Sequence, residues 1–172
     1  MVKTMAFFNP EKFTEEAVAK LKTELTDKAI IAASGGVDST VAAVLAAKAV
    51  KNNLLAIYVD TGYMRLGESE YVSSMLSNLG VQHKVVDASE KFYAGLKGIT
   101  DPEQKRKIIG ELFIRVFEKE AEDYGGKFLV QGTIAPDWIE SGGGLRDTIK
   151  SHHNVGGLPE DMEMILREPI RG

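Results

Sequence analysis

The chain of 172 residues is 44% hydrophobic and 27% charged, with a net charge of −4, so we expect one α/β domain. This slight acidity argues against a broad basic surface for nucleic acid, and no apolar run approaches the length that spans a membrane. Cysteine is absent, which excludes disulfides, thiolate metal sites and thiol catalysis and is typical of a cytoplasmic protein.

Apolar periodicity divides the chain into helices and strands that alternate. The predicted helices cover residues 12–25, 41–50, 66–79 and 102–124, and the predicted strands cover 29–33, 54–59, 82–86, 127–131 and 162–166. Thr100 and Glu103 form a capping box at the start of the longest helix, and residues 108–117 supply its apolar face. Strands that alternate with helices predict an open parallel β-sheet with helices on both faces.

A motif rich in glycine and hydroxyl side chains follows the first strand and opens the second helix. It consists of Ser34, Gly35, Gly36, Val37, Asp38, Ser39 and Thr40. Unpaired N–H groups and the helix dipole make such a turn an anion site, and Gly35 and Gly36 permit positive φ and close approach. Because Asp38 would repel a bound phosphate, we infer Mg²⁺ bridging Asp38 and a polyphosphate. The alternative is an ordinary strand–helix turn in which the Ser and Asp side chains only cap the helix.

Two common phosphate-binding loops do not fit this motif. The Walker pattern needs a lysine before its Ser/Thr, and here Asp38 precedes Ser39. The dinucleotide fingerprint needs three spaced glycines, and only the adjacent Gly35 and Gly36 are present.

The motif resembles instead the PP-loop of the ATP pyrophosphatases, whose signature is SGGxDS. Three further segments, at 100–110, 131–141 and 149–160, resemble the synthetase domain of GMP synthase. The resemblance implies an adenine nucleotide alpha hydrolase-like fold, with residues 1–172 forming the ATP pyrophosphatase domain. It also implies that the family's C-terminal dimerisation domain, which would make the protein a homodimer, is absent from this chain.

The resemblance implies a ligase that uses ATP and Mg²⁺ to aminate XMP to GMP. The reaction passes through an adenylyl-XMP intermediate and releases AMP and pyrophosphate. Because the chain has no cysteine nucleophile, nitrogen must come from a separate subunit or from free ammonia, and we expect a separate glutamine amidotransferase subunit to supply it. The alternatives are another PP-loop ligase, such as one like NAD synthetase, or an ATP-binding module without catalysis.

The resemblance also suggests roles for individual residues. Asp38 would hold Mg²⁺, and Lys150 would contact the reacting phosphate or XMP. The other residues expected to line the nucleotide site are Val59, Asp60, Gly62, Gly132 and Thr133. From position alone, Asp60 is equally well explained as a turn residue at the end of a strand.

Several polar segments keep two interpretations. Lys105, Arg106 and Lys107 oppose the dipole of their helix, so they are either phosphate contacts or a solvated face. The aperiodic segment 132–160 is either a lid over the acceptor or a disordered excursion. His83 is isolated and favours a structural role. The adjacent His152 and His153 have poor zinc spacing and favour substrate positioning.

Overall fold

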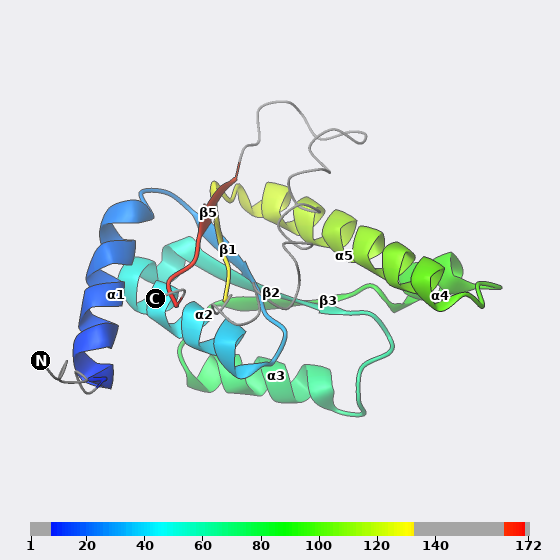
Figure 1. Cartoon of the computed structure of the whole chain (residues 1–172), viewed down its shortest axis with the longest axis horizontal. Coiled ribbons are helices and arrows are strands. Elements are labelled where there is room, and N and C mark those ends of the chain that lie inside the picture. Colours follow the sequence, from blue (N-terminus) through cyan, green and yellow to red (C-terminus); the bar gives the residue numbers. More distant parts are fainter. Residues whose placement is uncertain (1–7, 133–163, 171–172) are drawn as a thin grey trace, which may run out of the picture.

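The computed structural model describes residues 8–132 and 164–170 as a β-sheet between two layers of helices (Figure 1). The helices are α1 (Pro10–Glu24), α2 (Val37–Val50), α3 (Glu68–Asn78), α4 (Ser89–Leu96) and α5 (Pro102–Tyr124), with a 3-10 turn, η1 (Lys51–Asn53). The strands are β1 (Ala29–Ala32), β2 (Leu54–Asp60), β3 (His83–Asp87), β4 (Phe128–Val130) and β5 (Ile165–Arg167).

All neighbouring strands in the sheet are parallel, in the order β3-β2-β1-β4-β5, which confirms the predicted fold class. In the central strand, Ile30 is aligned with Leu55 of β2 on one side and with Leu129 of β4 on the other. The chain moves outward from β1 to β3 and then returns to place β4 on the opposite side of β1. The strand order therefore reverses between β1 and β4, and ligands of open parallel sheets bind at such a reversal.

Side chains that alternate along the strands build a core on each face of the sheet. Ala56 and Tyr58 of β2 pack with α1, α2 and α3, while Ile57 and Val59 pack with α4 and α5. Figure 1 shows α2 and α3 on one side of the sheet and α5 on the other. Small side chains let α2 lie close to the sheet, and four alanines of this helix are buried: Ala42, Ala43, Ala46 and Ala49.

The structure corrects the predicted ends of three elements. The N-cap of α5 is Asp101, whose carboxylate accepts the Gln104 N–H at 2.8 Å, so the capping box at Thr100 is wrong. Helix α2 begins at Val37 rather than residue 41, because the motif itself supplies its first turn. Strand β5 begins at Ile165, where pairing with β4 starts.

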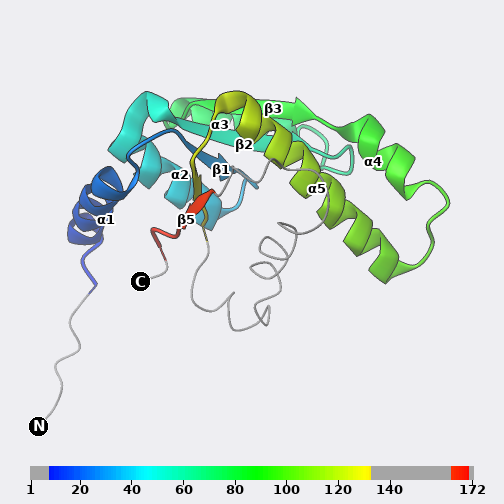
Figure 2. The same ribbon diagram turned by 90° about the horizontal axis from the view of Figure 1, so that it is seen from above.

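One helix was missed, and one apolar face is narrower than predicted. Helix α4 has only eight residues, too few for a clear period, and one of them, Phe92, is buried against the α5 side of the sheet. On α5, Val116 and Phe117 are buried as expected, but Ile109 is 37% exposed. This helix starts beside α4, where Figures 1 and 2 show it extending beyond the sheet, so its early apolar residues have less to cover.

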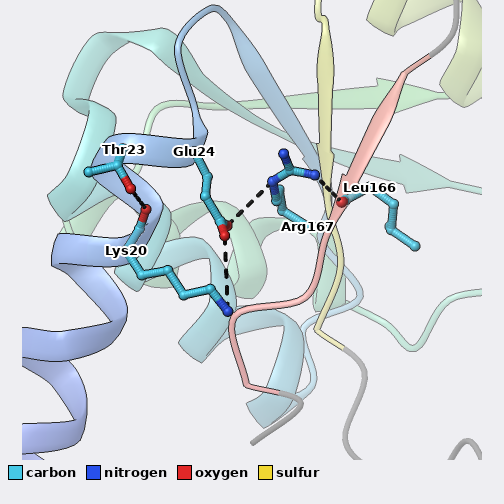
Figure 3. Close-up of polar contacts among 5 residues, drawn as sticks. All are labelled: Lys20, Thr23, Glu24, Leu166 and Arg167. Carbon is cyan, nitrogen blue, oxygen red and sulfur yellow. Dashed lines mark hydrogen bonds and ion pairs between the residues drawn. The ribbon is translucent and has the colours of Figure 1, made fainter.

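The edge strand β5 is tied to α1 by an ion pair (Figure 3). Arg167 Nε lies 3.3 Å from Glu24 Oε2, and its guanidinium also donates to the Leu166 carbonyl at 2.9 Å. A cavity of about 540 Å³ lies between α1 and β5, and none of the residues that line it belongs to the predicted nucleotide site. Within residues 8–132 and 164–170, no helix is long and apolar enough to cross a bilayer.

Candidate nucleotide site

The motif at 34–40 connects β1 to α2 at the carboxyl edge of the sheet. Gly35 has a φ of +76°, so it needs the left-handed conformation that glycine adopts at least cost. Gly36 is instead extended, with φ −75° and ψ 161°, and it is the N-cap of α2. Both glycines could adopt a positive φ, but only Gly35 does so in the structure.

Hydroxyl groups of the motif hold its own backbone. The Ser34 and Ser39 hydroxyl oxygens lie 2.9 Å apart. Ser39 and Thr40 donate to the Gly36 carbonyl at 3.1 and 2.7 Å. These bonds connect the loop to itself and fix its shape. In this arrangement the partners of the hydroxyl groups are atoms of the loop.

The free donors of the motif are backbone N–H groups. Val37, Asp38 and Ser39 form the first turn of α2, where a helix offers no acceptor for its own N–H groups. Gly36, the N-cap, has no side chain that could accept a hydrogen bond from these N–H groups. No other described residue accepts one from them either. Together with the positive end of the helix dipole, they form a place for an anion.

Asp38 is the carboxylate nearest to this anion site along the chain. Its side chain is partly exposed and makes no hydrogen bond or ion pair with the residues that the structure describes. Those residues contain no cluster of three or more His, Cys, Asp or Glu side chains that could hold a metal alone. One free carboxylate beside an anion site fits Mg²⁺, which proteins commonly bind through one or two carboxylates and substrate phosphates.

Gly132 closes the site from the other side of the strand reversal. A Cβ atom at this position would lie 2.7 Å from the Asp38 carbonyl oxygen and 2.8 Å from the Ser39 Cα. The chain leaving β4 therefore touches the first turn of α2 through backbone alone. This contact places Gly132 against the motif at 34–40, where an added Cβ atom would collide with backbone.

An apolar cavity of about 340 Å³ opens beside Gly132, between α5 and the ends of β1 and β4. The residues that line it include Ala32, Phe113, Phe117, Leu129 and Met164. Aromatic and aliphatic walls next to a phosphate-type anion site suit a flat, poorly hydrated group such as a nucleobase.

The end of β2 lies next to the end of β1, because the two strands pair in parallel. The Val59 side chain is 1% exposed and sealed in the core, so only its backbone can meet a ligand. Gly62 has a φ of +76°, and its carbonyl accepts the Tyr93 hydroxyl at 2.9 Å. The Asp60 carboxylate accepts the Gly62 N–H at 2.8 Å and also the Ser69 hydroxyl. Its contacts in the structure are thus those of a turn residue, and a contact with nucleotide stays a prediction.

Sequence comparisons agree with this arrangement. The family model described as NAD synthase matches residues 9–115, which is more than half of the chain and includes the motif and the end of β2. The chain belongs to the NAD synthase family. The matched part contains the whole motif at 34–40, whereas Gly132 lies beyond it.

Curated relatives that are more than half identical to this chain share the name of one enzyme. The chain is 57% identical over 166 residues to a subunit of glutamine-hydrolyzing GMP synthase from Methanocaldococcus jannaschii, covering 95% of this chain and 52% of the relative. It is 52% identical over 162 residues to the subunit of the same name from Thermoplasma acidophilum, covering 92% and 52%. The chain therefore spans about half the length of these curated relatives. They confirm the resemblance to the GMP synthase synthetase domain.

A solved structure supports the fold alone. NMN synthetase from Francisella tularensis matches with a TM-score of 0.65 and 20% identity, covering 76% of this chain and 57% of that chain.

Some predicted residues are not brought to the site. Lys105, Arg106 and Lys107 are exposed at the start of α5, which Figures 1 and 2 show beside α4 and away from the start of α2. Arg106 pairs with Glu103 at 2.8 Å, on a solvated surface. His83 has the structural role expected, since its two ring nitrogens lie 2.8 Å from the Ser73 hydroxyl and 3.1 Å from the Val81 carbonyl.

Part of the predicted site lies outside the described residues. This applies to Thr133, Lys150, His152, His153 and the aperiodic segment after Gly132.

Sequence reasoning missed the contacts that come from other elements. Val72 of α3 touches the loop at Gly35, and Phe113 and Phe117 of α5 line the cavity. The helical period identified Phe113 and Phe117 only as part of an apolar face, and it gave Val72 no role beyond its place in a predicted helix. Nothing in a local pattern could have shown which loop or cavity they meet.

Proposed function

We propose that the chain binds ATP across the reversal between β1 and β4. The triphosphate lies on the N–H groups of Val37, Asp38 and Ser39, and the adenine enters the cavity beside Gly132. The single observation that carries this proposal is the backbone contact between Gly132 and the first turn of α2. It joins an anion site and an apolar base site within one crevice, as a nucleotide requires.

The proposed acceptor is XMP, which is aminated to GMP with release of AMP and pyrophosphate. The support is the name shared by relatives that are 52–57% identical, together with the segment at 149–160 that resembles GMP synthase. The C2 oxygen of xanthine is a poor leaving group, and attack on the α-phosphorus of ATP converts it into one that departs readily. Ammonia then displaces AMP from the adenylyl-XMP intermediate, so the protein is a ligase that forms a C–N bond.

The chain's own residues contribute position and charge. The N–H groups of the first turn of α2 bind the β and γ phosphates and stabilise the charge that grows as pyrophosphate departs. Mg²⁺ held by Asp38 would supply further stabilisation of that charge. Lys150 is proposed to contact the reacting phosphate or XMP, and Thr133 to complete the nucleotide site.

Nitrogen is proposed to reach the site as ammonia from a separate glutamine amidotransferase subunit. The relatives are named as one subunit of a glutamine-hydrolyzing enzyme, and this chain contains no cysteine. We further propose a homodimer through the part of the relatives that this chain does not cover.

The test is the formation of GMP and pyrophosphate from XMP, ATP, Mg²⁺ and ammonium chloride, with each omitted in turn. Product that requires all four supports the proposal. A parallel reaction with nicotinate adenine dinucleotide in place of XMP tests an activity like that of NAD synthetase. Product only in this second reaction would overturn the choice of acceptor, and ATP binding without any turnover would favour a non-catalytic module.

The proposed metal role has its own test in Asp38→Ala. Removing the free carboxylate is expected to weaken ATP binding in the presence of Mg²⁺. It should strengthen Mg²⁺-free binding, because the Asp38 carboxylate repels phosphate when no cation lies between them. Titration calorimetry with and without Mg²⁺ measures both values. Equal affinity of both proteins with Mg²⁺ present would refute the role of Asp38.

A further inference from the structure

Asp60 clamps both ends of the connection between β2 and α3. One carboxylate oxygen accepts the Gly62 N–H at 2.8 Å, at the start of this connection. The other accepts the hydroxyl of Ser69, in the first turn of α3. The Asp60 carbonyl also accepts the Ala88 N–H at 2.8 Å, which fixes the residue to the chain that leaves β3. Asp60 therefore sets where α3 begins relative to the end of β2.

Helix α3 transmits that position to the phosphate-binding motif. Ser69 and Val72 are three residues apart and therefore lie on the same side of the helix. Val72 is 1% exposed, and its Cγ2 lies 2.8 Å from where a Cβ of Gly35 would be. Gly35 is the residue whose φ of +76° gives the motif its turn. The side of α3 that Asp60 holds is thus the side that packs on the loop.

We infer that Asp60 is a positioning residue for the PP-loop, acting through Ser69, α3 and Val72 rather than by touching the nucleotide. This inference rests on the proposed binding of ATP phosphates at the motif. The motif's own bonds connect residues 34–40 to one another, so they shape the loop without setting its place in the crevice. The packing of Val72 on Gly35 supplies that placement from outside.

The test measures binding of the phosphate part of ATP and binding of its nucleoside part in separate experiments. Binding of inorganic pyrophosphate with Mg²⁺ and binding of adenosine are measured by calorimetry for the 172-residue chain and for Asp60→Ala, Ser69→Ala and Ser69→Thr. Loss of the hydroxyl is expected to weaken pyrophosphate binding roughly tenfold, since small misplacements of a binding group are costly. Adenosine binding should be nearly unchanged, because none of the residues that line the proposed base cavity belongs to α3 or to the connection before it. Ser69→Thr keeps a hydroxyl and should restore pyrophosphate binding.

Ser74→Ala is the matched control, because Ser74 is exposed on the same helix. It removes a serine hydroxyl from α3 without touching Asp60, and pyrophosphate binding should be unchanged.

Two results would overturn the inference in different ways. If Asp60→Ala weakens adenosine and pyrophosphate binding alike while Ser69→Ala weakens neither, Asp60 contacts the nucleotide directly. If the unaltered chain binds adenosine but no pyrophosphate, the proposed phosphate site itself is wrong. Unfolding midpoints measured for every variant show that a loss of binding is not a loss of fold, and Ser69→Ala remains informative if Asp60→Ala does not fold.

Discussion

Gly132→Ala tests the contact on which the nucleotide site depends. The added Cβ would lie 2.7 to 2.8 Å from three backbone atoms of Asp38 and Ser39, and backbone cannot rotate away as a side chain can. Ordinary contacts begin near 3.4 Å, so the end of β4 and the start of α2 must separate by about 0.6 to 0.7 Å. Overpacking of this kind costs about 1–3 kcal/mol of stability. A shift of this size in the anion site should also lower ATP affinity roughly tenfold.

The assay combines urea unfolding with calorimetric binding of ATP and Mg²⁺. Gly80→Ala provides a control of similar stability cost, because Gly80 follows α3 at a φ of +69° with nothing within 4 Å of a Cβ. It should lose about 1 kcal/mol from backbone strain and leave ATP affinity unchanged. The reasoning is refuted if Gly132→Ala binds ATP as tightly as the unaltered chain, or if both variants lose the same affinity.

Two further predictions concern stability. Asp101→Ala should destabilise the protein by about 1 kcal/mol through loss of the α5 N-cap, whereas Thr100→Ala should change the urea midpoint little. A larger loss in Thr100→Ala than in Asp101→Ala would instead support the capping box at Thr100. Burial raises the pKa of the Tyr58 hydroxyl, and the nearby Ser69 hydroxyl lowers it by a smaller amount without making a hydrogen bond of ordinary geometry. The associated stability is therefore fully present below the unfolded pKa of about 10 and is lost as pH rises through the folded pKa. Tyr58→Phe should reduce this alkaline loss and remain within about 1 kcal/mol of the unaltered chain at pH 7; a larger loss at pH 7 would reveal a partner for the hydroxyl.

Local patterns in the sequence determined the elements and the motif. The apolar strand 29–33 and the alanine-rich helix after it could be predicted because burial on a sheet imposes its period on neighbouring residues. Residues 34–40 indicated an anion site for the same local reason, since a glycine turn that opens a helix leaves N–H groups unpaired wherever it occurs. Asp101 was missed because Thr100 and Asp101 are both good caps, and only the path of the chain into α5 selects between them.

Contacts between distant segments were decided by the tertiary structure alone. The approach of Gly132 to Asp38, the packing of Val72 on Gly35 and the bond from Ser69 to Asp60 each join elements that local periodicity treats separately. Sequence could place Asp60 at the end of a strand, but its partners depend on how far α3 is rotated over the sheet. Such contacts depend on the order of the strands and on how the helices pack over the sheet. No local pattern in a single sequence encodes the strand order or the packing.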